Sequence, residues 1–176
     1  RNGWCGESLN ALETLKVVEG SGAQALAIHG RTRVQLYRGA ADWDIVGELA
    51  SIASIPVIGS GDILSSEDAR RRFDETGCAG VMIGRGATGR PWFPGQVMHY
   101  LASGERRADP PLSLQGEVVR EHIDEMLSHF GVYTGLRMAR KHIAWYSRGR
   151  NFSAEFRNNI NPIGRFTQLG RLNHRA

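Results

Sequence analysis

Cysteine is scarce in this sequence, with only Cys5 and Cys78 among 176 residues. Two cysteines cannot form the disulfide framework that stabilises small secreted domains, and they lack the Cys-x-x-Cys spacing of redox or metal sites. The sequence therefore fits a reducing compartment, and we expect a cytoplasmic protein with two free thiols and no bound metal.

Long hydrophobic runs are also absent. The longest, over residues 52–58, is interrupted by Ser54 and Pro56, and it is far shorter than the roughly 20 apolar residues that cross a bilayer. The first four residues, Arg-Asn-Gly-Trp, contain neither an apolar signal core nor an initiator Met. We therefore expect no membrane partner, and we expect that the chain begins partway through a longer protein.

Charge is distributed unevenly along the chain. The net charge is +4, with 41% hydrophobic and 23% charged residues, which is a normal globular composition. Residues 1–103 contain ten Arg or Lys and eleven Asp or Glu, whereas residues 131–176 contain nine basic residues and one acid, Glu155. This asymmetry fits a polyanionic partner for the C-terminal part, and it fits an ordinary solvated basic surface equally well.

Helix and strand signals alternate through the first hundred residues at intervals of roughly 25 to 30 residues, which predicts βαβ units and a parallel sheet. Three short strands make a poor core, and a parallel sheet needs cover on both faces, so we expect further strands before Arg1. The predicted helices cover residues 8–19, 42–51 and 65–77, and the predicted buried strands cover residues 25–28, 55–58 and 79–83.

A linker rich in Gly, Pro and charge, residues 104–111, separates this part from a helical one. Apolar residues then recur at helical spacing over residues 118–130, and a second helix is predicted over residues 136–148. The sequence therefore predicts an α/β domain over residues 1–103 and a small all-helical domain over residues 112–176.

Glycine-rich loops follow the second and third predicted strands, as Gly59-Ser60-Gly61-Asp62 and Gly84-Arg85-Gly86. Glycines let the backbone approach a ligand closely, and an Arg beside free N–H groups attracts anions. Each loop alone is equally typical of a tight turn without a ligand. Two such loops on adjacent strands favour a ligand that carries a phosphate.

His29 ends the first predicted strand and is followed by Arg31 and Arg33. A single His at a strand end is more often structural than functional, but the carboxyl ends of parallel strands meet at one edge, where the glycine loops also lie. We therefore include His29 in the candidate site. Arg31 and Arg33 either contact phosphates or face solvent.

A basic stripe is predicted on the helix over residues 136–148, because Arg137, Lys141 and Arg148 fall on one side at about 100° per residue. RNA suits such a stripe, since each neutralised phosphate releases counterions. The alternative is an ordinary amphipathic helix with a charged exterior, but charges of one sign favour RNA. The predicted RNA-binding residues are Arg137, Arg140, Lys141 and Arg148. The apolar residues predicted to pack into the domain from the opposite side are Met138, Ala139, Ile143, Trp145 and Tyr146.

Several segments, in the same order along the chain, resemble tRNA-dihydrouridine synthases, most closely their bacterial B-type branch. The resemblance extends from Arg1 to about Ile160 and so covers most of the chain. The segments are Ile28–Arg33, Ala41–Trp43, Ile55–Ile63, Gly80–Ala87, Gly89–Trp92 and, in the helical part, Arg140–Tyr146.

The resemblance implies the C-terminal part of a (β/α)₈ TIM barrel, followed by a small helical tRNA-binding domain. It implies a flavin-dependent enzyme that reduces particular uridines of tRNA to 5,6-dihydrouridine, with FMN as cofactor and NADPH as reductant. tRNA is then the partner, and no stable protein partner is implied. By the same resemblance, the residues that hold FMN are His29, Ser60, Gly61, Asp62, Gly84 and Arg85, with His29 against the flavin and the others at its phosphate.

Two features depart from what a complete family member contains. The family usually has Asn where Ser60 stands, so one amide contact is lost although a hydroxyl remains. The family's proton-donor cysteine lies upstream of Arg1, and neither Cys5 nor Cys78 takes its place, because Cys78 adjoins a buried strand and Cys5 has no partner that would lower its pKa. The resemblance therefore implies no catalytic residue in this chain, and the chain alone is expected to be inactive.

Two other functions stay open from the sequence. Another FMN-dependent TIM-barrel oxidoreductase would share the phosphate loops, although the basic helical extension argues against it. An RNA-binding module without catalysis would share the basic stripe. Flavin absorbance separates the enzymes from the module, and turnover on tRNA against small pyrimidines separates the two enzymes.

Overall fold

The computed structural model describes residues 1–149. The rest of the predicted helical domain, residues 150–176, lies outside the described residues. The chain divides into two compact units, which are described separately below: one comprises Arg1–Ala87 and Trp92–Arg107, and the other comprises Thr88–Pro91 and the residues from Ala108 onward.

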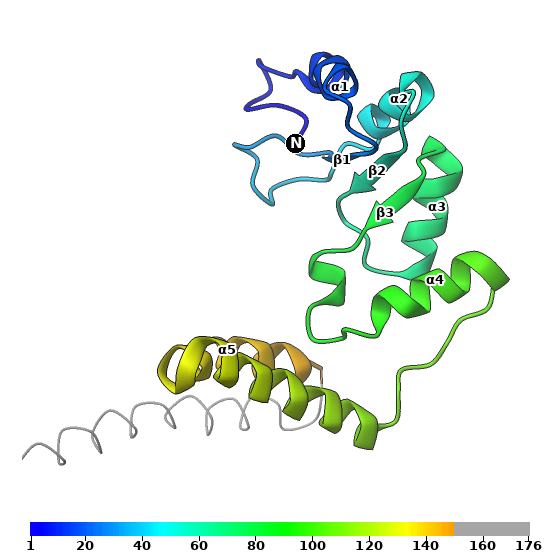
Figure 1. Cartoon of the computed structure of the whole chain (residues 1–176). Helices are drawn as coiled ribbons and strands as arrows, with labels where there is room; N and C mark the ends of the chain where they lie inside the picture. The colour runs from blue at the N-terminus through cyan, green and yellow to red at the C-terminus, as the bar shows by residue number, and fades with distance from the viewer. Residues whose placement is uncertain (150–176) are drawn as a thin grey trace, which may run out of the picture. The chain divides into compact units, whose positions relative to one another are not determined.

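The first unit alternates strands and helices around a parallel sheet (Figure 1). Its three strands lie in the order β1-β2-β3, and both neighbouring pairs are parallel. This confirms the predicted α/β class and parallel sheet. The elements are α1 (Ala11–Gly20), β1 (Leu26–His29), α2 (Asp44–Ile52), β2 (Val57–Ser60), α3 (Ser66–Thr76), β3 (Gly80–Met82), the 3₁₀ turn η1 (Arg85–Ala87) and α4 (Phe93–Ser103).

The two faces of this sheet differ in burial. Ile28 on β1 and Val57 on β2 belong to the hydrophobic core that the strands share with the helices. Ala27 on β1 pairs with Ile58 of β2, and Met82 on β3 pairs with Ser60, so both lie on the other face of the sheet, where they are exposed. The prediction of buried strands is therefore wrong for Ala27 in the first strand and for Met82 in the third, whose side chain is 48% exposed. The cause is that, among residues 1–149, one face of the sheet is left open.

Local sequence signals set some element boundaries correctly and others not. α3 begins with a capping box, in which Ser65 Oγ accepts from Asp68 N–H and the Asp68 carboxylate accepts from Ser65 N–H. The prediction that Ser8 opens the first helix is wrong, because Ser8 Oγ instead accepts from Cys5 N–H, and α1 begins at Ala11. β2 begins after Pro56 because proline has no N–H to give the sheet, so this strand starts two residues later than predicted.

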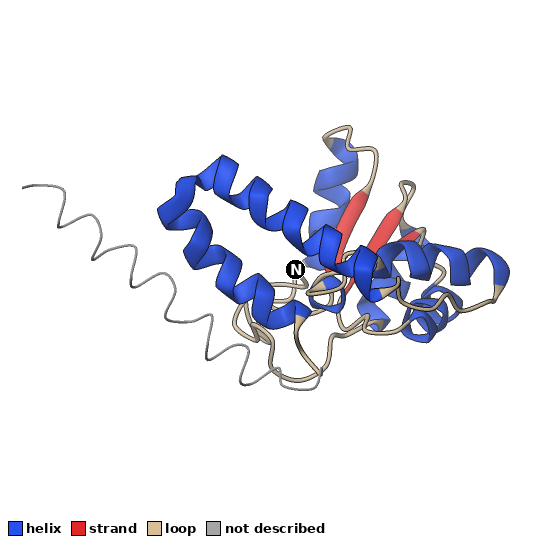
Figure 2. Ribbon diagram, turned by 90° about the horizontal axis from the view of Figure 1, so that it is seen from below, coloured by secondary structure: helices blue, strands red, loops and turns tan. Residues whose placement is uncertain are grey.

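The second unit contains one long element, α5 (Leu112–Tyr146), which is broken at Gly131. Its two segments fold back on each other as antiparallel arms (Figure 2). This agrees with two predicted helices, although the first begins earlier than predicted. Met126 is buried, whereas Phe130, predicted to belong to the apolar face, is exposed because it adjoins the break.

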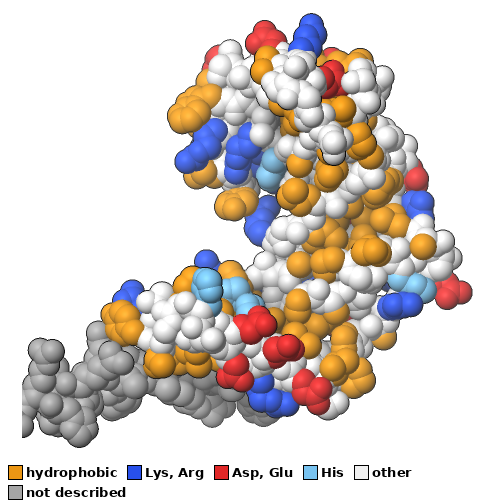
Figure 3. All heavy atoms as spheres, viewed as in Figure 1, with side chains coloured by type: hydrophobic (Ala, Val, Ile, Leu, Met, Phe, Trp, Pro, Cys, Tyr) orange, Lys and Arg blue, Asp and Glu red, His pale blue; other side chains and the backbone are white. Residues whose placement is uncertain are grey.

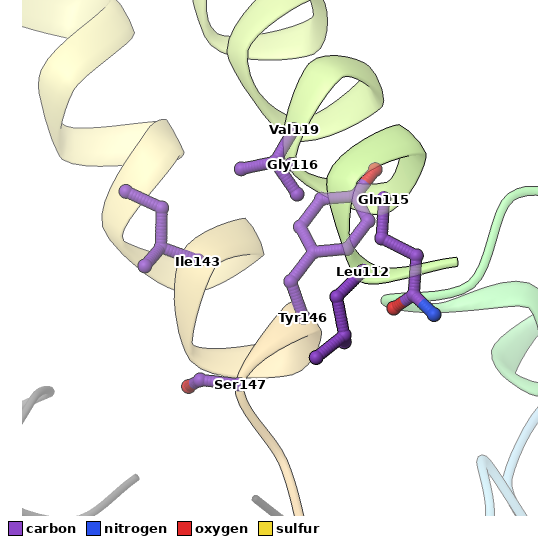
Figure 4. Close-up of a pocket in the computed structure, with 7 residues that line it drawn as sticks. All are labelled: Leu112, Gln115, Gly116, Val119, Ile143, Tyr146 and Ser147. Atoms are coloured by element: carbon purple, nitrogen blue, oxygen red, sulfur yellow. The ribbon is translucent and has the colours of Figure 1, made fainter. Parts of the chain in front are cut away.

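The open ends of the two arms enclose an apolar pocket of about 310 Å³. Figure 4 shows Leu112 and Val119 on the first arm opposite Ile143 and Tyr146 on the second. The hydroxyl of Tyr146 lies 3.0 Å from Nδ1 of His122, so a polar contact also joins the arms.

Three further observations concern membrane helices, metal-ligand clusters and cysteines. None of the helices in residues 1–149 is both long enough and apolar enough to cross a membrane. The same residues contain no group of three or more His, Cys, Asp or Glu side chains placed to hold a metal ion. Cys5 and Cys78 are free thiols, and Cys78 is buried in the core as predicted.

We predict opposite effects of alanine at two glycines of α5. Gly131 has φ 73° and ψ 163°, a conformation nearly restricted to glycine, so Gly131→Ala is expected to destabilise the fold by about 1–3 kcal/mol. Gly116 is helical, and an added Cβ meets only the flexible end of Arg120, so Gly116→Ala is expected to stabilise by about 0.5–1 kcal/mol. Urea unfolding of the full-length protein measures both. Equal effects would contradict the assigned backbone at Gly131.

Candidate functional site

A small pocket opens at the carboxyl edge of the sheet, where the loops after the three strands meet. Its volume is about 150 Å³, below the roughly 300 Å³ at which small-molecule pockets usually begin. The size suits one small group, such as a phosphate, better than a whole cofactor. All six sequence-predicted cofactor residues line it, namely His29, Ser60, Gly61, Asp62, Gly84 and Arg85.

A chain of charged contacts organises this edge. Arg31 Nη2 donates to Asp62 Oδ2 at 2.6 Å, and Arg85 Nη2 donates to the other oxygen, Oδ1, at 3.1 Å. The Arg31 side chain is only 2% exposed, and it also donates to the backbone carbonyls of Arg38 and Gly39. Arg31 therefore does not face solvent, and its charge is already paired. Asp62 thus links a buried guanidinium to the exposed guanidinium of Arg85.

The backbone before and at Asp62 is held in an unusual conformation. Gly61 has φ 142° and Asp62 has φ 54°, and a Cβ on Gly61 would lie 2.4 Å from Cβ of Ala41. The indole N–H of Trp43 donates to the Gly61 carbonyl at 3.1 Å, and Ala41 N–H donates to Asp62 Oδ2 at 2.8 Å. The segment that leads into α2 therefore clamps the loop after β2 from one side.

The environment of Asp62 keeps it ionised. Partial burial alone would raise its pKa, but the hydrogen bond from Ala41 N–H and the contacts with Arg31 and Arg85 outweigh it and hold the pKa below the ordinary value. Both carboxylate oxygens are used by these donors. Asp62 is thus placed to orient Arg85, while Arg85 itself provides positive charge at the pocket.

The surroundings of His29 favour the neutral form of its ring. Burial lowers its pKa, the charges of Arg1 and Arg31 lower it further, and Asp62 opposes them. The Nδ1 atom accepts the backbone N–H of Arg31 at 3.2 Å. The proton of the neutral ring is therefore on Nε2, which can donate to a ligand.

Three residues at this edge were not resolved by sequence reasoning. The sequence leaves two roles open for Arg31, contains Trp43 only within a longer motif, and offers no signal that marks Tyr37. Tyr37 lines the pocket, and the guanidinium carbon of Arg85 lies 4.4 Å from the centre of its ring. The sequence shows that Arg31 is a cation after the first strand, but it does not show that its partner is Asp62, 31 residues further along the chain.

The second arm of α5 carries three of the four residues of the predicted basic stripe. The prediction that Arg148 lies on the same helix is wrong, because α5 ends at Tyr146 and Arg148 lies in the turn that follows. Arg137, Lys141 and Arg148 are exposed, and Arg140 is half-buried. The guanidinium of Arg137 lies 5.6 Å from the centre of the Tyr133 ring and donates to the Tyr133 hydroxyl at 3.1 Å. These contacts hold one cation of the stripe in a defined position on the helix surface.

Of the residues predicted to pack opposite this stripe, Met138 does not, and Trp145 is only partly buried. Trp145 lies beside the stripe, with Lys141 Nζ 4.9 Å from the centre of its ring, because residues four apart share a helix face. Met138 is exposed, while Ala139 is fully buried as predicted. Ile143 and Tyr146 are partly buried.

Comparisons with known proteins agree on one family. The family model described as "Dihydrouridine synthase (Dus)" matches residues 1–172. A "Probable tRNA-dihydrouridine synthase" of Rickettsia conorii is 43% identical over 161 residues, which are 92% of this chain and 49% of that protein. The proteins named "tRNA-dihydrouridine synthase B" of Pseudomonas putida and Pectobacterium carotovorum are each 42% identical over 163 residues, or 93% of this chain, and 48% and 51% of those proteins. The chain thus spans about half the length of the curated relatives it matches.

We predict that Asp62→Asn is far more destabilising than Arg85→Gln. Asn tolerates the left-handed backbone at this position, but it leaves the buried Arg31 without a counter-charge, at a cost of about 3 kcal/mol. The exposed pair with Arg85 is worth less than about 1 kcal/mol. Urea unfolding of the full-length protein at pH 7 measures the difference.

The pH dependence gives a second check on the same pair. Because the folded-state pKa of Asp62 is depressed, the ionised carboxylate stabilises the fold above its unfolded pKa of about 3.9. That stabilisation is lost as the pH falls through the folded-state value. The gap between wild type and Asp62→Asn should therefore shrink below about pH 4. A constant gap would contradict the ion pair.

Proposed function

The chain belongs to the dihydrouridine synthase family, and from this premise we propose that the full-length protein reduces particular uridines of tRNA to 5,6-dihydrouridine. We propose FMN as its cofactor and NADPH as its reductant. The observation that carries the proposal is that the predicted cofactor residues line one pocket, in which Asp62 bonds to the guanidinium of Arg85. These residues are His29, Ser60, Gly61, Asp62, Gly84 and Arg85.

We infer that the first unit is part of a (β/α)₈ barrel. The open sheet face, which carries Ala27 and Met82, corresponds to the barrel interior in this proposal, and α1 to α4 correspond to its outer layer. Asn2 Oδ1 and Arg31 Nη1 are buried without a hydrogen-bond partner among the described residues. Both lie near β1, so the neighbouring strand of a closed barrel would satisfy them. The domain division proposed is barrel to residue 103, linker over 104–111, and helical domain from 112.

The pocket fits the phosphate of FMN by size and by charge. A volume of about 150 Å³ admits a phosphate, and the Arg85 guanidinium supplies a cation with fork-like donors that match its oxygens. Ser60 adds a hydroxyl, and the glycines at 61 and 84 leave the backbone accessible. The ionised Asp62 would repel a phosphate, so we assign it the role of orienting Arg85 instead of binding the ligand.

In the proposed reaction, the residues of this chain bind and orient the flavin. When bound, reduced FMN would supply hydride to the uracil ring, and NADPH would reduce the oxidised flavin again. His29 lines the pocket, and its Nε2–H would donate a hydrogen bond to the bound flavin. Cys78 is buried, and its Sγ donates to the Gly80 carbonyl, so we assign the proton donor to a cysteine of the full-length protein outside this chain.

For the second unit we propose that the basic stripe of Arg137, Arg140, Lys141 and Arg148 contacts the tRNA backbone. Three of these side chains are exposed, and aromatic neighbours position two of them. Fixing a cation in advance lowers the entropy lost when it pairs with a phosphate. A shallow groove lined by Tyr133, Arg137 and Lys141 runs beside them.

The direct test of the function is turnover. Purified full-length protein with FMN and NADPH should form dihydrouridine in unmodified tRNA and should not reduce free uracil or orotate. If the protein binds flavin but reduces only small pyrimidines, the chain belongs to another kind of flavin enzyme. If the protein binds tRNA but no flavin, its function is RNA binding without catalysis.

We predict that Arg85→Met weakens FMN binding by roughly 10- to 100-fold, the value of a charge-assisted hydrogen bond. Arg85→Lys keeps the charge but loses the fork, and it should fall between wild type and Arg85→Met. Flavin fluorescence titration of the full-length apoprotein measures the dissociation constants. Unchanged affinity in Arg85→Met would remove Arg85 from the phosphate site.

We predict that Arg137→Glu with Lys141→Glu weakens tRNA binding and flattens its salt dependence. Each lost phosphate contact should reduce the slope of log K against log salt by roughly 1. Lys16→Glu with Arg107→Glu, two exposed cations of the first unit, provides a charge-matched control. If the double variant follows the wild-type salt series, the stripe is only a solvated face.

A further inference from the structure

Two loops at the carboxyl edge of the sheet are joined into one surface. One covers residues 3–9, before α1, and the other covers residues 31–40, between β1 and α2. Arg33 N–H donates to the Gly3 carbonyl, and Val34 N–H donates to the Trp4 carbonyl, both at 2.9 Å. The loops are therefore held together by backbone hydrogen bonds and do not depend on side chains for their relative position.

Large apolar side chains project from this surface. Trp4 is 66% exposed and Leu36 is 50% exposed, and Val34, whose N–H bonds to Trp4, is exposed as well. Leu36 also has φ 53°, a left-handed conformation that is costly for a branched side chain. Exposed apolar neighbours together with backbone strain are typical of a recognition surface. We call Trp4, Val34 and Leu36, with Arg33 and Arg38, the loop platform.

The charge around these apolar side chains is positive. Arg33 and Arg38 are exposed within the second loop, and Arg1 adds a further exposed cation, while Glu7 is the only acid in the two loops. Arg38 also donates to the Val34 carbonyl at 3.2 Å. Figure 3 shows basic and hydrophobic side chains together on the face around the loops near the N-terminus. A partner for this surface must therefore combine flat apolar area with negative charge.

The loop platform continues into the cofactor pocket. Tyr37 belongs to the second loop, lines that pocket, and lies under Arg85 at 4.4 Å. The loop that bonds to Trp4 through Val34 therefore also forms part of the pocket wall through Tyr37. An unpaired nucleotide meets all of these demands, because every base offers a flat face for stacking and every nucleotide carries a phosphate.

We propose that the loop platform binds an unpaired nucleotide of the substrate RNA, with its base against Trp4 and its phosphate beside Arg33 and Arg38. This inference rests on the proposed function, because it takes tRNA as the substrate. It adds an RNA contact on the first unit that is independent of the basic stripe on α5. Stacking on Trp4 supplies sequence-tolerant affinity, and the cations anchor the adjoining backbone.

The test uses full-length protein and unmodified substrate tRNA in a binding titration across a salt series. Trp4→Ala should weaken tRNA binding roughly 5- to 150-fold, the loss of one base stack on an aromatic ring, without changing the salt slope. Trp4→Tyr keeps a stacking ring and should retain most of the affinity, which also guards against a folding defect. Arg33→Gln and Arg38→Gln should each lower the salt slope by roughly 1.

Matched controls separate this inference from the proposed function. Val17→Ala removes a comparably exposed apolar side chain from α1 and should leave tRNA binding unchanged. Trp4→Ala should also bind FMN like wild type, because Trp4 does not line the pocket.

If wild type forms dihydrouridine but Trp4→Ala binds tRNA equally well, this inference alone is overturned. If Trp4→Ala instead changes only the sedimentation of the protein, the platform is a self-association surface and the inference is also overturned. A wild type that binds no tRNA overturns both proposals.

Discussion

The ion pair between Arg31 and Asp62 is the contact on which the rest of the site depends. A guanidinium that is 98% buried cannot be left without a counter-charge, so the loop after β2 must bring Asp62 to it. That requirement fixes the left-handed turn at Asp62 and its neighbour Gly61. The second carboxylate oxygen then reaches Arg85 on the loop after β3. One buried charge thereby holds the loops of all three strands in a single arrangement.

The two units offer positive charge in different ways, and the proposed ligands explain the difference. At the sheet edge, Arg85 is aimed by Asp62 into a small pocket, which suits one phosphate at a fixed place. On the exposed surface of α5, Arg137 and Lys141 lie one helical turn apart, next to the rings of Tyr133 and Trp145. Exposed cations spaced in this way suit a long polyanion whose phosphates are spread along a surface. The same residue types thus serve a cofactor in one unit and a nucleic acid in the other.

Much of the fold and of the site composition could be predicted from the sequence. The βα alternation, the parallel sheet and the cap at Ser65 follow from local patterns, and the meeting of His29 with the loops at Asp62 and Arg85 follows from parallel strands sharing one edge. The partner of Arg31 could not be predicted, because 31 residues of chain separate it from Asp62 and only the tertiary fold brings them together. The open face at Met82 and the position of Trp145 beside Lys141 were missed for a related reason. From the sequence alone, an apolar residue is assigned to the core by default, and only its neighbours in the tertiary fold show whether it is exposed.

The proposed pocket selects the phosphate of a flavin by means of the Arg85 guanidinium, which Asp62 orients. The most direct measurement compares FMN with riboflavin, which is the same flavin without the phosphate, in titrations of the full-length apoprotein. FMN should bind at least about tenfold more tightly than riboflavin, and this preference should fall sharply in Arg85→Met, which removes the guanidinium from the pocket. Equal affinity of the wild type for FMN and riboflavin would contradict this selection.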